Sequence, residues 1–112
     1  MTSQKKYQRI ADVCGLLSHP ERLHILDELR RQEACVCHLQ AVLERPQAYV
    51  SQQLRVLRQA GVVTDHRDGI MVYYQVADDL VIDLLEKTLG PAGEPSRPAG
   101  CSCPMCGGQE GA

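Results

Sequence analysis

The stretch PQAYVSQQLRVLRQAGVVTDHRDGIMVYYQV, residues 46–76, decides the fold. In its first half the apolar residues recur at helical spacing until Gly61, a residue type that commonly ends a helix. From residue 62 the apolar period changes to two, and residues 67–69, Arg-Asp-Gly, lie between two arms; Asp-Gly is typical of a tight hairpin. The inward positions of the predicted helix are Val50, Leu54 and Leu57. The stretch therefore predicts a helix followed directly by a two-stranded ribbon.

Four more helices are predicted around this stretch. The first ends near residues 15–17, and a capping box at Ser18–Glu21 begins the second, which runs to about Arg31. The third begins at residues 35–37 and ends before Pro46, which starts the next helix in its first turn. The last helix covers Asp78–Leu89. Its predicted apolar stripe is Val81, Leu84, Leu85 and Thr88. In the second helix, the residues expected to point inward are Leu23, Leu26 and Leu29. Those expected to face water are Asp27, Glu28, Arg30 and Arg31.

Composition divides the chain into two parts. Residues 1–89 form the predicted domain, and residues 90–112 form a Gly- and Pro-rich tail expected to be flexible. No apolar run is long enough to cross a membrane and the first residues are polar, so we expect a cytoplasmic protein without a membrane partner. In that reducing compartment the six cysteines favour soft-metal binding or thiol switching over a disulfide framework. Cys14, alone on a helix, is predicted to lie in the core.

Two helices joined by a three-residue turn and followed by a ribbon indicate a mainly α protein with a small β-hairpin, the winged helix-turn-helix. The helix after the turn would enter the major groove of DNA. Although the formal net charge is −2, residues 46–64 contain no acid, so a local basic face is possible. The outward side chains expected to contact bases and phosphates are Gln47, Ser51, Gln52, Arg55 and Arg58, with Arg67 at the wing tip.

The first and last predicted helices carry apolar stripes that a domain of this size cannot cover by itself. Such stripes favour a homodimer. Two recognition helices would then meet successive major grooves about 34 Å apart, on a near-palindromic operator.

Three segments resemble the ArsR/SmtB family of metal-responsive winged-helix repressors. Residues 17–26 look like its second helix, residues 50–63 look like its recognition helix entering the wing, and E-A-C-V-C-H-L at residues 33–39 is similar to the family's E-L-C-V-C-D-L metal box. The resemblance implies a repressor of the arsenic-responsive ArsR type, not an enzyme, that controls metalloid resistance genes. Ala34 and His38 depart from the box. The last predicted helix has no histidine, so the family's other metal site is not supported.

Cys35 and Cys37 are the predicted core of the metal site, because thiolates at a helix start are stabilised and bind soft ions. Residues i and i+2 of a regular helix point to nearly opposite sides, so shared binding requires a distorted first turn. We expect the resulting movement to pass through Leu39, Val42 and Leu43 to the recognition helix. Cys101, Cys103 and Cys106 can supply a third thiolate from either subunit, or form a site of their own.

Three thiolates suit As(III) or Sb(III), as the resemblance implies, while cadmium, lead and mercury remain open. Zinc is less favoured because it usually takes four ligands, although His38 could be the fourth. Two rival functions use the same cysteines. Thiol oxidation could replace the ion as signal, and a thiol-based metal carrier or enzyme could use the tail, but no general base lies beside a nucleophile in a recognisable pattern.

Overall fold

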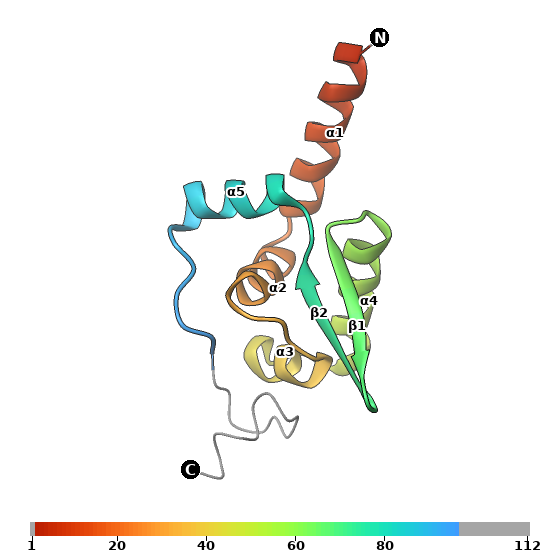
Figure 1. Cartoon of the computed structure of the whole chain (residues 1–112), viewed down its shortest axis with the longest axis vertical. Coiled ribbons are helices and arrows are strands. Elements are labelled where there is room, and N and C mark those ends of the chain that lie inside the picture. Colours follow the sequence, from red (N-terminus) through yellow and green to blue (C-terminus); the bar gives the residue numbers. More distant parts are fainter. Residues whose placement is uncertain (1, 97–112) are drawn as a thin grey trace.

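The computed structural model describes residues 2–96 and has the predicted winged helix-turn-helix fold, with five helices and one hairpin (Figure 1). The elements are α1 (Thr2–Leu17), α2 (Pro20–Arg31), α3 (Val36–Leu43), α4 (Gln47–Gln59), β1 (Val63–Asp68), β2 (Met71–Val76) and α5 (Asp79–Leu89). Among these residues, no helix has both the length and the hydropathy needed to cross a membrane. Helix α1 projects from the body, while α3 and the wing tip lie at the opposite end (Figure 1).

One apolar cluster joins α2, α3, α4, α5 and the base of the wing. The predicted α4 stripe is confirmed, since all three of its residues are at most 1% exposed. Val62 and Val63 extend the same core into the hairpin, so the base of the wing is fixed to α4. The largest side chains below 2% exposure among the described residues are Ile25, Leu26, Leu39, Val50, Leu54, Leu57, Val62, Val63, Val81 and Leu85.

Proline sets two helix starts, and both differ in detail from the prediction. Pro20 forces the residue before it into extended backbone, so His19, at φ −106° and ψ 123°, is the N-cap of α2. The predicted capping box is therefore wrong: the Ser18 hydroxyl instead donates to the Gly15 carbonyl at 2.7 Å. Pro46 is the N-cap of α4 and lies one residue before the predicted position in the helix.

The hairpin loop begins two residues later than predicted. Its loop is Gly69 and Ile70, because β1 continues to Asp68 and pairs it with Met71. Gly69 has φ +66°, and glycine at the first position of a two-residue loop is the pattern of a type II′ turn. Arg67 is consequently a strand residue opposite Val72 and is not at the tip. The residue at the tip is Ile70, which is 93% exposed.

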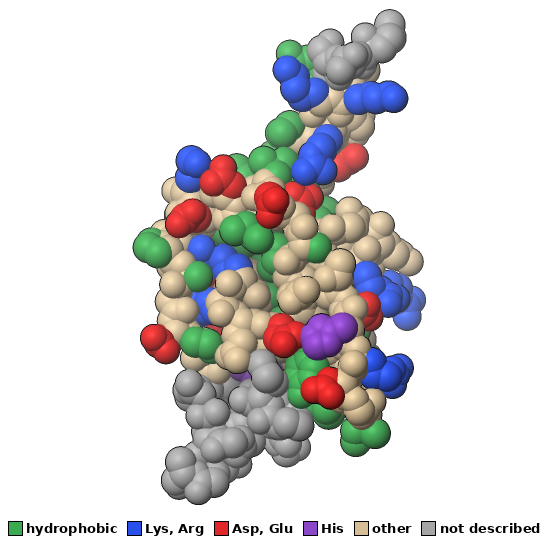
Figure 2. All heavy atoms as spheres, viewed as in Figure 1, with side chains coloured by type: hydrophobic (Ala, Val, Ile, Leu, Met, Phe, Trp, Pro, Cys, Tyr) green, Lys and Arg blue, Asp and Glu red, His purple; other side chains and the backbone are tan. Residues whose placement is uncertain are grey.

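Helices α1 and α5 leave apolar side chains in contact with water. Val13 is the buried residue of α1, whereas Tyr7, Ile10 and Cys14 are exposed. The prediction that Cys14 belongs to the core is wrong for a single chain, because α1 extends beyond the body (Figure 2). On α5, Ile82 and Leu89 are exposed. Thr88 is exposed as well, contrary to the predicted stripe, and its hydroxyl donates to the Leu84 carbonyl at 2.7 Å.

Candidate DNA-binding surface and thiol site

The outer face of α4 carries the residues predicted to contact DNA. Burial of the apolar stripe leaves the predicted polar set on the opposite side of the helix. Basic side chains gather along the edge formed by α4 and the wing (Figure 2). Five of the predicted residues are exposed, and Ser51 is half-buried: the exposed ones are Gln47, Gln52, Arg55, Arg58 and Arg67.

The start of α4 is attached to α2 through Glu21. The Arg45 guanidinium donates to this carboxylate at 2.6 Å and lies 5.4 Å from the centre of the Tyr49 ring. A hydrogen bond from Tyr49, followed by the contact with Arg45, lowers the pKa of Glu21; the same bond raises the pKa of Tyr49. Residue-type patterns did not reveal this cluster, because Glu21 is far from Arg45 and Tyr49 in sequence and each is an ordinary surface residue.

The other end of α4 is attached to the wing. Arg58 donates to Asp65 on β1 at 3.1 Å, so part of its charge is already compensated. Within residues 2–96, neither Arg55 nor Arg67 forms an ion pair. Arg55 and Arg67 are therefore the cations of this surface most available to a phosphate.

The two thiols of the metal box meet at the start of α3. Cys35 is the N-cap, with φ −89° and ψ 171°, so it lies outside the helix in extended backbone. Cys37 lies in the first turn, and the two sulfur atoms are 2.8 Å apart. The predicted conflict of i and i+2 geometry is thus resolved by a boundary between extended and helical backbone, without distortion of the helix. Cys35 is 2% exposed and Cys37 is half-buried.

Within the described part of the chain, no third His, Cys, Asp or Glu completes a group that could hold a metal ion. His38 is next to the pair in sequence, but its ring bonds to Glu28. The other candidate ligands predicted from sequence, Cys101, Cys103 and Cys106, lie outside the described residues.

The thiol pair is joined to the wing. Ala34 donates to the Tyr74 carbonyl at 3.0 Å and accepts from the Tyr74 amide at 2.8 Å, which adds one strand-like bridge to β2. Cys35 packs with Tyr73 in a small apolar cluster, and Tyr73 is only 3% exposed. The burial of Tyr73 by Cys35 cannot be seen in the strand's own pattern, because the covering segment is distant in sequence.

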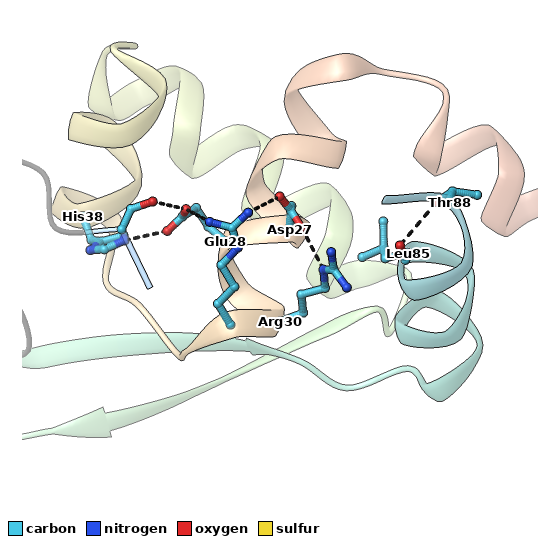
Figure 3. A network of polar contacts seen from close by, with 8 residues as sticks. Asp27, Glu28, Arg30, His38, Leu85 and Thr88 are labelled. Atoms are coloured by element: carbon cyan, nitrogen blue, oxygen red, sulfur yellow. Dashed lines mark hydrogen bonds and ion pairs between the residues drawn. The ribbon is translucent and has the colours of Figure 1, made fainter. Parts of the chain in front are cut away.

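A buried polar network lies on the other side of α3 (Figure 3). The Glu28 carboxylate contacts His38 Nε2 at 3.0 Å and accepts from the Ser96 hydroxyl at 2.5 Å. Glu28 is 4% exposed, so the prediction that it faces water is wrong. It follows Ile25 by three residues, and this helical spacing could have placed it on the inner face. Ser96 holds the described end of the chain against α2 and α3.

Burial raises the pKa of Glu28, but its hydrogen bonds with His38 and Ser96, together with the positive charge of Arg31, outweigh burial and hold the pKa below its ordinary value. The ionised carboxylate therefore joins α2, α3 and the C-terminal segment.

The family model of the arsR family of bacterial regulatory proteins matches residues 19–65. A transcriptional repressor SmtB homolog of Synechocystis sp. is 42% identical over 77 residues, which are 69% of this chain and 58% of that protein. The repressor SmtB of Mycobacterium tuberculosis is 40% identical over 91 residues, 78% of this chain and 67% of the repressor. The chain belongs to the arsR family. It thereby falls in a class of DNA-binding transcriptional regulators and not of enzymes.

Two further comparisons concern the ion and the assembly. The cadmium resistance regulatory protein CadC of Listeria innocua is 35% identical to this arsR-family protein over 72 residues, 63% of this chain and 60% of CadC. The homodimeric winged helix-turn-helix domain Mb0332 of Mycobacterium bovis superposes with a TM-score of 0.70 at 26% identity, covering 78% of this chain and 81% of that one. Its fold and the fold of this arsR-family protein are the same.

We predict that Glu28→Gln lowers stability in a pH-dependent way. The folded pKa of Glu28 lies below its ordinary value of 4.5, so its charge stabilises the fold above that pH and this contribution disappears as the pH falls through the folded pKa. Urea unfolding near pH 7 should give a loss of about 1–2 kcal/mol, shrinking on acidification. The exposed Glu86→Gln is the control. A loss independent of pH would contradict the ionised network.

Proposed function

We propose that this protein is a homodimeric transcriptional repressor that binds operator DNA and is released when a soft ion binds the thiolates of Cys35 and Cys37. The observation that carries the proposal is the 2.8 Å approach of the two sulfur atoms at the start of α3. Soft ions prefer thiolates, and a helix start stabilises the thiolate form. The genes controlled would confer resistance to the inducing ion, and the protein would act in the cytoplasm.

The DNA-binding half of the proposal rests on α4 and the wing. Gln47, Ser51 and Gln52 lie early on α4, where side chains of a recognition helix meet base edges. Arg55, Arg58 and Arg67 are placed for phosphates. Amide side chains can form two hydrogen bonds to adenine, and a hydroxyl can donate or accept a hydrogen bond. The polar residues early on α4 would therefore set the sequence preference, and the three arginines would set the affinity.

Dimerisation is supported by the exposed apolar side chains of α1 and α5. Tyr7 is 65% exposed and Leu89 is 51% exposed in a single chain. A second copy would remove these surfaces from water. The homodimeric state of the similar Mb0332 domain supports the same assembly.

We propose As(III) or Sb(III) as the inducing ion, because three thiolates suit either one and the metal box resembles that of arsenic-responsive repressors. Cadmium is the nearest alternative, supported by the similarity to CadC; lead and mercury bind the same ligands. Zinc has less support, since it usually takes four ligands.

The third thiolate is proposed to come from the tail, residues 90–112, which lies beyond the DNA-binding domain of residues 1–89. Ser96 bonds to Glu28, and Glu28 also bonds to His38, which follows Cys37 in the sequence. Cys101 follows Ser96 by five residues, an extended span of at most about 17 Å. This anchoring supports a site completed by Cys101, Cys103 or Cys106 of the same subunit.

The sulfur approach also favours a second candidate signal, thiol oxidation. The two thiols would lose two protons and two electrons to a peroxide, which would leave as water and an alcohol or as two waters, and one S–S bond would form. Arsenite and peroxide, tested separately for operator release, distinguish the two signals.

The joint variant Cys35→Ser with Cys37→Ser should bind operator as the wild type does and should no longer be released by arsenite, because serine oxygen is a poor ligand for soft ions. Fluorescence anisotropy of a labelled operator, selected from a randomised duplex pool, measures both. Cys14→Ser is the matched control and should behave as the wild type. Ending the chain after Ser96 should weaken arsenite binding and leave operator binding unchanged. Release of the double variant by arsenite would show that the box is not the sensor.

Arg55→Ala and Gln52→Ala should affect DNA binding differently. The arginine variant loses a phosphate contact, so it should bind all sequences more weakly and lower the salt slope of log K by about 1. The glutamine variant should keep the slope and change preference at one base pair by about 1–3 kcal/mol. Operator binding between low and moderate salt measures both quantities. An unchanged slope for Arg55→Ala would remove this residue from the interface.

A further inference from the structure

Three consecutive residues before α3 each contact the wing. The Glu33 carboxylate bonds to His66 Nε2 on β1, and Ala34 forms its two main-chain bonds with Tyr74 on β2. Cys35 packs against Tyr73, and both side chains are buried. The connection between α2 and α3 therefore lies against the wing and is joined to it by an isolated β-bridge.

The apolar cluster around the thiols is separate from the main core. In the described part of the chain its members are Cys35, Cys37, Tyr73 and Met71, so its non-cysteine side chains both come from β2. Leu39 and Leu43 of α3 belong instead to the main core, which includes α4. The side chains that share a cluster with the thiols are thus those of the wing and not those of the recognition helix.

This contact lies toward the loop end of the hairpin. Val63 and Val76 pair at the base, where Val63 is 1% exposed in the core. Met71 pairs with Asp68 next to the loop, at the other end of the ribbon. Arg67 pairs with Val72, between Met71 and Tyr73 in the sequence of β2. A displacement of this half of β2 moves Arg67 while the base stays fixed.

Binding of one ion by both thiolates requires such a displacement. The two sulfurs are already in contact, so an ion bound by both must take its place beside them and change the position of at least one of them. Cys35 is 2% exposed and lies against Tyr73 in a cluster with little free space, so its movement has to be taken up by β2.

We propose that Tyr73 and Met71 are positioning residues that transmit ion binding from the thiol pair to the wing and thereby withdraw Arg67 from DNA. This inference rests on the proposed function and replaces the route through Leu39, Val42 and Leu43 that the sequence suggested. The recognition helix keeps its place in the main core, and release follows from the changed position of the wing.

The test uses the full chain, arsenite and a labelled operator duplex, with anisotropy measuring operator affinity with and without arsenite and absorbance measuring arsenite binding. The ratio of the two operator dissociation constants is the coupling factor, typically about 5–150 in such systems. Met71→Ala should bind arsenite and free operator within about twofold of wild type but lower the coupling factor at least about fivefold. Met71→Leu, whose side chain has a similar volume, should keep the wild-type coupling factor.

Leu43→Ala is the matched control, since it shortens a side chain of α3 that belongs to the main core, and it should keep the wild-type coupling factor. As a second test, Arg67→Ala should weaken operator binding in the absence of arsenite. Arsenite should then lower the operator affinity of this variant by a smaller factor than in the wild type. An unchanged factor in Met71→Ala, or a lost one in Leu43→Ala, would overturn the wing route while leaving the repressor intact. A wild-type protein that arsenite does not release would instead overturn the proposed function, and the wing route with it.

Discussion

The extended backbone of residues 33–35 is the constraint on which the rest of the site depends. Because Ala34 is bridged to Tyr74, Cys35 cannot join α3 and becomes its N-cap. That placement turns a Cys-x-Cys pair, which a continuous helix would separate, into two sulfurs in contact. The same bridge covers Tyr73 and joins the wing to the thiols. This short connection therefore determines how the two thiols are placed, how deeply they are buried and that their neighbour is the wing.

The electrostatics of the DNA-binding surface fit a protein that must be removable from its operator. The whole chain has a formal charge of −2, so attraction to DNA depends on a few cations at the α4 edge. Two of the arginines near this surface, Arg45 and Arg58, are paired with Glu21 and Asp65. Arg55 and Arg67 then contribute a large share of the attraction. Loss of one such contact would therefore remove a substantial fraction of the free energy of DNA binding.

Sequence patterns predicted most of the fold because the main core repeats regularly within each element. Val50, Leu54 and Leu57 lie on one face of a helix, and the outward residues of α4 follow from them. The patterns failed where a distant segment covers a residue, as His38 and Ser96 cover Glu28. They failed again for Cys14, because an apolar helical stripe does not reveal which surface covers it. The thiol pair itself was predictable from spacing, but its geometry required knowledge of the bridge to β2.

The central claim is that ion binding at the thiols and DNA binding oppose each other, and thermodynamic linkage tests it directly. Arsenite affinity should be measured for the free protein and for the protein saturated with operator duplex. The account predicts weaker arsenite binding in the complex, by the same factor by which arsenite weakens operator binding. Equal arsenite affinity in the two states would mean that the two sites are not coupled and would contradict the account.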